Sequence, residues 1–411
     1  MDVLYPQCAA IDVHKRTAVA AVGWTDERGH RRREVRTFAT MTGDLERLRD
    51  WLGAHGATHV AMESTGVYWK PIFHILEERF AVVLANAAHV KAVPGRKTDV
   101  RDAEWLLELM QHGLIRPSFI PPAPIRALRE LTRYRANLVQ ERAREVNRIQ
   151  KVLEDANIKL AAVVTDVLGV SGRLMLQALI DGETDPQALA ALAKGRLCKK
   201  RVVLAEALTG RVGAHHRLLL RELLAHIDYL DGALGRLGEE IAERLRPYAA
   251  DVELLCSIAG IKGRVAEVLL AELGADMGPW LDARHLCSWA ALCPGNNQSG
   301  GKQRSGRTRQ GNPWLKRVLV QAAWAAVRVK DGYLGAQFRR IAKRRGEQRA
   351  LIAVAHSLLT IVYHVLKQGT PYQELGAAYF DRFDAGRQAR YHLRRLAELG
   401  YVLPAAAQPA A

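Results

Sequence analysis

The chain lacks the paired cysteines that mark a disulfide framework or a structural zinc site. Its 5 cysteines are scattered over 411 residues, form no CxxC pair and have no Cys/His spacing suited to zinc. An odd number of scattered thiols favours a reducing compartment. We expect no apolar run long enough to span a bilayer and no signal peptide at the N-terminus. We therefore expect a cytoplasmic protein with no membrane partner.

Acidic residues are too few to balance the basic ones. There are 43 Asp and Glu against 60 Lys and Arg, which gives a formal net charge of +17. With 49% hydrophobic and 25% charged residues the composition is globular, and the length allows two or three domains. A large positive field attracts phosphate groups, so the charge predicts a polyanionic partner. The charge alone does not decide whether that partner is nucleic acid.

The pattern of hydrophobic residues changes along the chain. Short apolar strands first alternate with amphipathic helices, which indicates an α/β domain. Two long amphipathic helices follow, and such helices are typical of coiled coils. We predict an α/β domain over residues 1–118, a coiled-coil region over 119–248 with a helical insertion near 160–212, an all-α domain over 249–330, and a helical extension over 331–411 with a disordered tail.

Four acidic residues of the first domain suggest a metal site. Asp12 lies inside the apolar strand "AAIDVHK", where a half-buried carboxylate must be paired, hydrogen-bonded or metal-bound. Glu63 closes a later strand, and Asp99 and Asp102 project from one face of a helix start. Two carboxylates about 4 Å apart repel by roughly 4 kcal/mol at an effective dielectric near 20. A ribonuclease-H-like sheet holds two Mg²⁺ ions with such a set. Taken singly, the last three are better explained as surface acids and helix-dipole partners, and only the set of four in this order favours the metal site.

The segment "LLCSIAGIKGRVAEVLLAELG", residues 254–274, has the rhythm of a helix-hairpin-helix. A helix ends before Gly260, and a second helix restarts near Val265. Backbone N–H groups at such a helix start bind phosphate without regard to base sequence. Lys262 and Gly263 lie at that start. An ordinary turn between two helices is the alternative interpretation.

The basic segment "PGNNQSGGKQRSGRTRQGNPWL", residues 294–315, contains two serines and no acidic residue. A serine hydroxyl is a weak nucleophile and needs activation. Glycines after Ser299 let the backbone approach a phosphate, and the neighbouring Lys and Arg side chains would stabilise charge on phosphorus. By itself the segment is best explained as a solvated basic loop. Together with the carboxylates it favours Ser299 as the nucleophile, with Ser305 as the competing candidate.

These motifs together resemble a known family. The chain contains "IDVHK", "MESTGVYW", "RKTDVRDAEWLLEL", "SIAGIKGRVAEVLLAELG" and "CPGNNQSGGKQRSGRTRQGNPWLKRVLVQAAW" in that order. The set resembles the DEDD-type insertion-sequence transposases, also called bridge-RNA-guided recombinases, which include the pilin-gene invertases. The resemblance extends from about residue 9 to residue 330. The chain departs from the family in "NAAHVKAVPG", where Asn-Pro is usual, and in the basic loop.

The resemblance implies a RuvC-like (ribonuclease-H-like) N-terminal domain, a coiled-coil region and a transposase domain. It implies that Asp12, Glu63, Asp99 and Asp102 bind Mg²⁺ and that Ser299 forms a covalent link to DNA. It also implies donor and target DNA as substrates, a guide RNA encoded by the element, and a site shared between protomers of a dimer or tetramer. The positions expected to contact nucleic acid are Lys262, Gly263, Arg264, Gly300, Gly301, Lys302, Arg304, Arg307, Arg309 and Lys316.

Two other functions are consistent with the same residues. The first is a RuvC-like nuclease that hydrolyses branched DNA with water, with Ser299 only contacting phosphate. The second is a non-catalytic protein that binds RNA or DNA through its basic helices. Asp12 within an apolar strand argues against the second, because a protein that only binds nucleic acid does not need that carboxylate.

Overall fold

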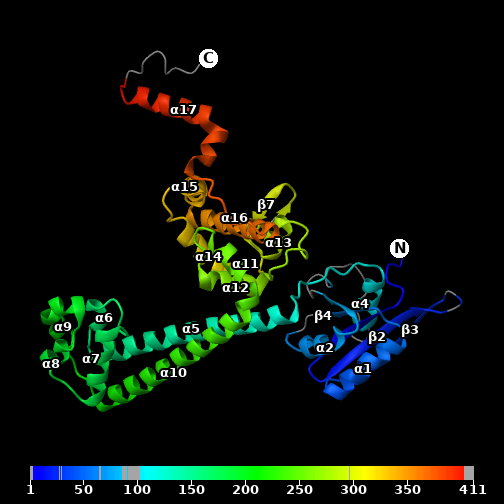
Figure 1. Ribbon diagram of the computed structural model, residues 1–411, viewed down its shortest axis with the longest axis horizontal. Helices are drawn as coiled ribbons and strands as arrows, with labels where there is room; N and C mark the ends of the chain where they lie inside the picture. Colours follow the sequence, from blue (N-terminus) through cyan, green and yellow to red (C-terminus); the bar gives the residue numbers. More distant parts are fainter. Residues whose placement is uncertain are drawn as a thin grey trace. The chain divides into compact units, whose positions relative to one another are not determined.

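The computed structural model divides the chain into two compact units, Met1–Ile120 and Pro121–Ala411 (Figure 1). The described residues are 3–401 with the exception of 27, 29, 64–65, 86–89, 91–101 and 296, and without the side chains of 297–299, 303–305, 381–385 and 387–388. Each unit has buried clusters of its own: two cover the faces of a sheet in the first unit, and one lies among helices of the second.

A five-stranded sheet in the order β3-β2-β1-β4-β5 forms the centre of the first unit. The strands β1, β2 and β3 are antiparallel neighbours, whereas β4 and β5 run parallel to β1. Strands that share a direction with β1 end at the same edge of the sheet. The strands are β1 (Cys8–Val13), β2 (Thr17–Thr25), β3 (Arg31–Ala39), β4 (His59–Glu63) and β5 (Ala81–Ala85).

Helices cover both faces of this sheet. The helices α1 (Thr42–Ala54) and α2 (Trp69–Leu76) share one buried cluster with Ile11 and its neighbours, and α4 (Asp102–Gln111) shares another with Ala10 on the opposite face. The predicted α/β domain is therefore confirmed. The edge strand β3 was not predicted. Nearly all its residues are exposed, so it has no apolar-polar alternation to reveal it.

Two long helices open the second unit, α5 (Ala123–Asp155) and α10 (Ala214–Leu245). Arg142 pairs with Asp231 and Asp155 with His216, so the two helices are antiparallel. Shorter helices near their far ends bury a core of leucine, isoleucine and valine. These are α6 (Leu160–Val163), α7 (Val170–Asp181), α8 (Pro186–Ala191), η2 (Gly195–Lys200) and α9 (Arg201–Ala207).

The rest of the second unit is mostly helical, as predicted, but it is not all-α. A two-stranded hairpin, β6 (Asn297–Ser299) and β7 (Lys302–Ser305), interrupts it. Gly300 and Gly301 have φ of +57° and +74°, the pair of positive angles that a tight hairpin turn needs. The helical elements are η3 (Arg246–Tyr248), α11 (Ala249–Cys256), α12 (Gly263–Leu273), α13 (Ala283–Trp289), α14 (Pro313–Ala326), α15 (Tyr333–Arg345), α16 (Glu347–Gln368), η4 (Ala377–Phe380) and α17 (Asp381–Glu398).

By length and composition alone, helix α16 could cross a membrane. The expectation that no apolar run reaches that length is therefore wrong. More than half of the helix's apolar stretch is buried inside the second unit, where Val354, Leu358 and Val362 are fully covered. The core helix of a soluble protein meets the same criteria of length and composition, so α16 is weak evidence for a membrane span.

Candidate active site and nucleic-acid interface

Asp12 and Glu63 lie side by side at the ends of neighbouring parallel strands. Ala10 of β1 and Ala61 of β4 are register partners, and both are buried beneath α4. Because side chains alternate between the faces of a sheet, Asp12 and Glu63, two residues further along, project toward that same face. Neighbouring strands lie about 4.8 Å apart. Both carboxylates are only half-buried, so they border solvent at the sheet edge.

Helix α4 brings Asp102 to the same edge. Its last residue, Gln111, lies against Gly23, whose strand partner is Cys8 at the start of β1. From Gln111 back to Asp102 the helix rises about 13.5 Å, and from Cys8 to Asp12 the strand rises about 13 Å. The helix runs antiparallel to β1, so Asp102 begins it at the level of Asp12. Three of the four predicted acidic residues thus share one face and one edge, and Asp99 lies outside the described residues.

The donors in this cluster are carboxylate oxygens, which are the ligands that Mg²⁺ and other hard divalent cations prefer. His14 also reaches the cluster: its Nε2 lies 3.1 Å from Asp12 Oδ2. The His14 side chain is 58% exposed, whereas that of Asp12 is 19% exposed. The residues at this edge therefore fit a divalent cation in a position that a substrate could approach from solvent.

In the second unit, Ser299 lies at the tip of a hairpin. It is the last residue of β6, followed by the Gly300–Gly301 turn and by Lys302 at the start of β7. The side chains of Ser299, Arg304 and Ser305 lie outside the described residues. Both turn residues are glycines and have no Cβ, so the backbone at the tip can approach a bound phosphate closely.

Backbone and side-chain contacts close the neck of this hairpin. Pro294 and Thr308 form an isolated bridge, and Gly295 N–H donates to Arg307 O at 3.0 Å. Lys316, which we predicted to contact nucleic acid, instead donates from its ammonium to Thr308 Oγ1 at 2.6 Å and so stabilises the neck. Arg309 donates to Ser288 Oγ at 3.2 Å. The exposed residues among the predicted contacts of this segment are Gly300, Gly301, Lys302, Arg307 and Arg309.

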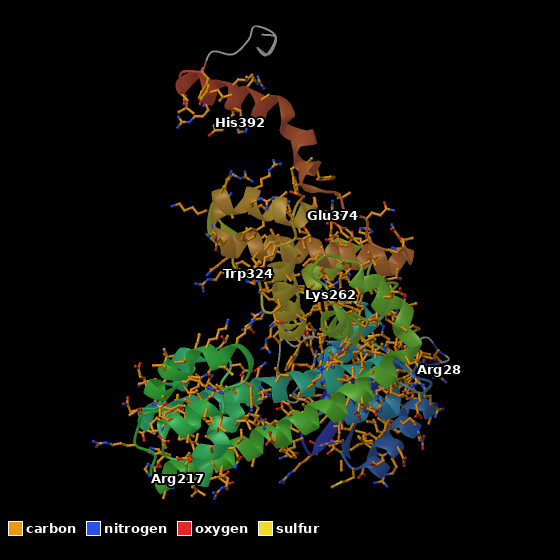
Figure 2. All side chains as sticks on the ribbon, turned by 60° about the vertical axis from the view of Figure 1, so that its left-hand side comes forward. Arg28, Arg217, Lys262, Trp324, Glu374 and His392 are labelled. Carbon is orange, nitrogen blue, oxygen red and sulfur yellow. The ribbon has the colours of Figure 1, made fainter. Side chains whose placement is uncertain are left out.

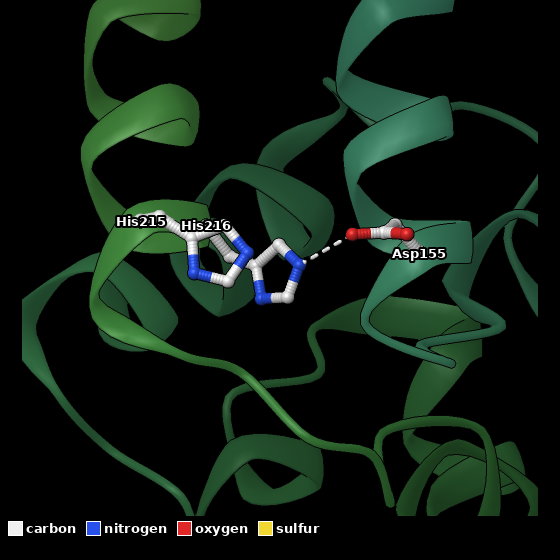
Figure 3. A group of neighbouring side chains, drawn as sticks. All are labelled: Asp155, His215 and His216. Carbon is white, nitrogen blue, oxygen red and sulfur yellow. Dashed lines mark hydrogen bonds and ion pairs between the residues drawn. The ribbon is translucent and has the colours of Figure 1, made fainter.

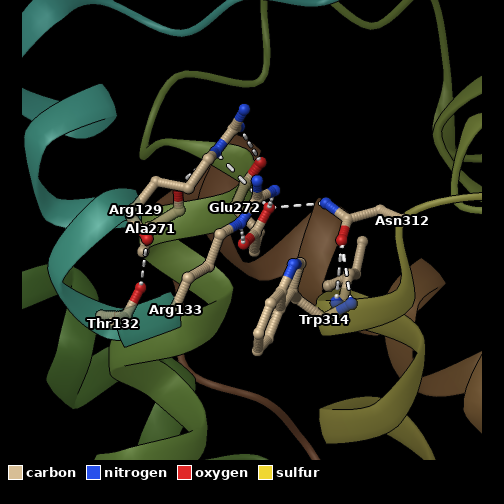
Figure 4. A network of polar contacts seen from close by, with 8 residues as sticks. Arg129, Thr132, Arg133, Ala271, Glu272, Asn312 and Trp314 are labelled. Atoms are coloured by element: carbon tan, nitrogen blue, oxygen red, sulfur yellow. Dashed lines mark hydrogen bonds and ion pairs between the residues drawn. The ribbon is translucent and has the colours of Figure 1, made fainter. Parts of the chain in front are cut away.

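A buried carboxylate, Glu272, connects the hairpin's supporting helices (Figure 4). It lies in α12 and is fully buried. Arg133 of α5 donates to both of its oxygens, at 2.7 and 2.8 Å, and Arg129 Nε lies 3.4 Å from Oε2. Asn312 Nδ2 donates to the same Oε2 at 2.5 Å. Burial lowers the pKa of Arg129 to about 10, against the opposing effect of the Glu272 charge.

This network fixes the segment that follows the serine hairpin. Asn312 is also the N-cap of α14, where its Oδ1 accepts from Trp314 N at 3.0 Å and Leu315 N at 3.2 Å. The Arg133 guanidinium lies 5.9 Å from the centre of the Trp314 ring. Glu272 therefore holds α5, α12 and the start of α14 together. Glu272 is not among the predicted site residues, although a glutamate inside the apolar run "VLLAEL" is a signal of a buried ion pair.

The predicted helix-hairpin-helix segment forms two helices joined by a tight turn. Gly260 has φ of +86°, and a Cβ there would lie 2.4 Å from Ala322 O and 2.7 Å from Ala326 N. The turn thus packs directly on α14. Beyond it Lys262 occupies the N-cap position of α12 without a side-chain capping bond. Lys262, Gly263 and Arg264 are all exposed at this helix start, and Lys262 is labelled in Figure 2.

A separate group in the described part of the second unit has metal-like spacing (Figure 3). Asp155, His215 and His216 offer ligand atoms within 4.8 Å of one another. However, His216 Nδ1 accepts from Gly213 N–H at 3.0 Å, and its Nε2 lies 2.8 Å from Asp155 Oδ2. A neutral imidazole has one N–H, so Nε2 donates to Asp155 and keeps no lone pair for a metal. The hydrogen bond lowers the pKa of Asp155 and ties the start of α10 to the end of α5.

Comparisons with known proteins agree with these motifs. Residues 9–158 match the DEDD-type IS110 transposase domain, described as "Transposase". Residues 252–339 match the family described as "Transposase IS116/IS110/IS902 family". The first match includes the three converging carboxylates, and the second includes the serine hairpin.

Individual relatives extend the similarity over most of the chain. The pilin gene-inverting protein of Moraxella lacunata is 32% identical over 82% of this chain and 90% of its own length. The protein of the same name from Moraxella bovis is 24% identical over the same shares. An insertion element IS110 protein of Streptomyces coelicolor is 30% identical, over 29% of this chain and 30% of its own length. The chain belongs to the IS116/IS110/IS902 family of transposases.

Proposed function

We propose that this protein is a DNA transposase of an insertion sequence, which cleaves and rejoins DNA strands through a covalent phosphoserine at Ser299. The observation that carries the proposal is the convergence of Asp12, Glu63 and Asp102 at one sheet edge in a chain that also presents Ser299 on a glycine-tipped hairpin. Relatives named for pilin gene inversion support it, because inverting a gene requires DNA strands to be cut and rejoined.

In the proposed reaction, the Ser299 hydroxyl oxygen attacks the phosphorus of a phosphodiester. A new P–O bond to serine forms while the bond to one deoxyribose oxygen breaks. The serine proton passes to solvent or a carboxylate, and the leaving deoxyribose oxygen takes up a proton. The number of phosphoester bonds is unchanged, so a second deoxyribose hydroxyl can reverse the step on a new partner without ATP.

The chain's own residues divide this work. Asp12, Glu63, Asp99 and Asp102 would hold Mg²⁺, because carboxylate oxygens are the ligands that this hard cation prefers. Bound by these carboxylates, the metal would supply positive charge that stabilises the developing charge on the phosphate oxygens. Lys302, Arg304 and Arg307 add positive charge around the phosphate. Membership of a DEDD-type family supports the use of a divalent metal.

The acidic cluster and Ser299 belong to different compact units. The proposal therefore requires the first unit of one chain to meet the serine hairpin of the same chain or of another chain in a dimer or tetramer. It also includes an element-encoded RNA that pairs with donor and target DNA, as the family resemblance implies. The exposed Lys262, Gly263 and Arg264 would contact the backbone of either nucleic acid.

The test uses end-labelled donor DNA, Mg²⁺ and the element's RNA. The wild-type protein should form a covalent protein–DNA adduct that survives denaturation. Ser299→Ala should form none, whereas the matched Ser305→Ala should retain it. Cleavage that persists without an adduct in Ser299→Ala but disappears in Asp12→Asn would instead show a hydrolytic nuclease. Binding of nucleic acid with no cleavage by the wild type would favour the non-catalytic alternative.

A further inference from the structure

A groove of about 1170 Å³ lies between the neck of the serine hairpin and the helices α15 and α16. The neck forms one wall through Pro294 and Thr308, which are paired to each other. The opposite wall comes from the end of α15 and the first turns of α16. A molecule in this groove would therefore lie directly beside the strands that lead to Ser299.

The groove is cationic. Arg307, Arg345 and Arg349 line it, and none of its described lining residues is acidic. Arg345 ends α15 and Arg349 lies in the first turn of α16, on either side of Gly346. Both are exposed, and neither forms an ion pair with another described residue. Two exposed guanidinium groups without acidic partners favour an anionic occupant such as phosphate.

The floor of the groove differs from its rim. Leu292, Ile352 and Ala353 give it an apolar surface. Gln337 Nε2 donates to Ser357 Oγ at 2.9 Å, which fixes the orientation of the amide. Its Oε1 is buried, with no hydrogen-bond partner among the described residues. An apolar surface beside exposed guanidinium groups suits the flat face of a base whose phosphates lie at the rim.

We propose that this groove holds an unpaired DNA strand, with its phosphates on Arg345 and Arg349 and its bases against the apolar floor. The inference rests on the proposed function, since it identifies the strand as the one whose phosphate reaches Ser299. An unpaired strand fits better than a duplex, because a duplex hides the faces of its bases. The volume exceeds the roughly 300–1,000 Å³ of pockets that hold one small ligand, so more than one nucleotide has room.

The test measures binding of a fluorescent single-stranded deoxyribonucleotide over a range of salt concentrations. All proteins are full-length and carry Ser299→Ala, so that no adduct forms. One variant adds Arg345→Ala and Arg349→Ala. The matched control adds Arg339→Ala and Arg344→Ala, which remove the same charge from exposed positions of α15 that do not line the groove.

Each lost phosphate contact lowers the slope of log affinity against log salt by about 0.7 for a single strand, so the groove variant should lose about 1.4. The control should keep the slope of its parent. A photoreactive thymidine in the same strand should crosslink to the peptide containing residues 346–357. Equal slopes in both variants, or tighter binding of duplex DNA or of RNA of the same sequence, would overturn the inference.

A parallel adduct assay uses the wild type and the Arg345→Ala/Arg349→Ala protein with Ser299 intact, so failure of the proposed function gives a different result from failure of the groove assignment. If Ser299 forms no adduct with DNA but the two double variants still differ in slope, the groove binds a strand and the covalent mechanism is wrong. If Ser299 forms its adduct at the wild-type rate in the Arg345→Ala/Arg349→Ala protein with an unchanged slope, the mechanism stands and the groove assignment is wrong.

Discussion

The carboxylate of Asp12 lowers the stability of the metal-free fold, because other carboxylates lie near it. Its carboxylate is half-buried beside Glu63 and near the start of α4, where like charges repel. A divalent cation removes that repulsion. The stability of the protein should therefore rise when a divalent cation binds beside Asp12.

Asp12→Asn should abolish stabilisation by Mg²⁺. At a Mg²⁺ concentration 100 times its Kd, the wild type should gain about 2.7 kcal/mol of unfolding free energy because the ion binds only the folded state. Thermal unfolding in EDTA and in Mg²⁺ measures the gain. Asp50→Asn is the control, since it removes an exposed carboxylate from α1 on the other face of the sheet. An equal Mg²⁺ effect in both variants would refute a role for Asp12 in binding the ion.

Glu272→Gln should destabilise the second unit by about 3–5 kcal/mol. The change leaves the buried guanidinium of Arg129 and the partly buried guanidinium of Arg133 without their counter-charge. Urea denaturation measures the loss. The exposed Glu240, paired with Arg244 within α10, is the control, and Glu240→Gln should cost less than about 1 kcal/mol. Similar losses in the two variants would show that burial of the Glu272 pair contributes nothing.

His356 should make the protein sensitive to acid. Burial lowers the pKa of its imidazole below the ordinary value of about 6.5. A histidine with a lowered pKa stays neutral in the folded protein while the unfolded chain takes up a proton. Stability from this group is complete above about pH 6.5 and is lost as pH falls toward the folded pKa. The unfolding midpoint of His356→Gln should fall less than that of the wild type between pH 7.5 and 5.5, and parallel curves would contradict the prediction.

Among the elements, the turn between α11 and α12 shows how a single glycine sets the packing of two helices. Gly260 has positive φ and approaches the backbone of α14. Gly263, three residues later, has open space where a Cβ would be. The same substitution should therefore destabilise the protein strongly at Gly260 and only slightly at Gly263.

Gly260→Ala should cost about 2–5 kcal/mol, because it adds left-handed strain to a collision with Ala322 O. Gly263→Ala should change stability by less than about 1 kcal/mol. Chemical denaturation of the two variants measures the difference. If Gly260→Ala is as stable as Gly263→Ala, the turn does not pack on α14 as described.

The elements also show which parts of the fold a sequence can predict. The strands β1, β4 and β5 and the helices α1, α4 and α5 follow from apolar periodicity. Strand β3 does not, because almost all of its residues face solvent. The β6–β7 hairpin was expected only as a basic loop, since two short strands around two glycines carry no hydrophobic pattern.

At the scale of the whole molecule, some features of the candidate site follow from local sequence patterns, and others depend on contacts between distant parts of the chain. Strand parity places Asp12 and Glu63 on one face, so their proximity could be predicted from local patterns. Glu272 could not be paired from the sequence, because Arg133 lies 139 residues away along the chain. The groove beside the hairpin was missed for the same reason: α16 meets the hairpin neck only after the chain folds.

The central claim is that the acidic cluster and Ser299 act on the same phosphodiester. The most direct measurement is mass spectrometry of peptides from protein incubated with donor DNA, the element's RNA and Mg²⁺. The account predicts a nucleotide bound to Ser299 in the wild type and no such adduct in Asp12→Asn or in EDTA. A nucleotide on another residue, or an adduct at Ser299 that forms equally in Asp12→Asn, would contradict it.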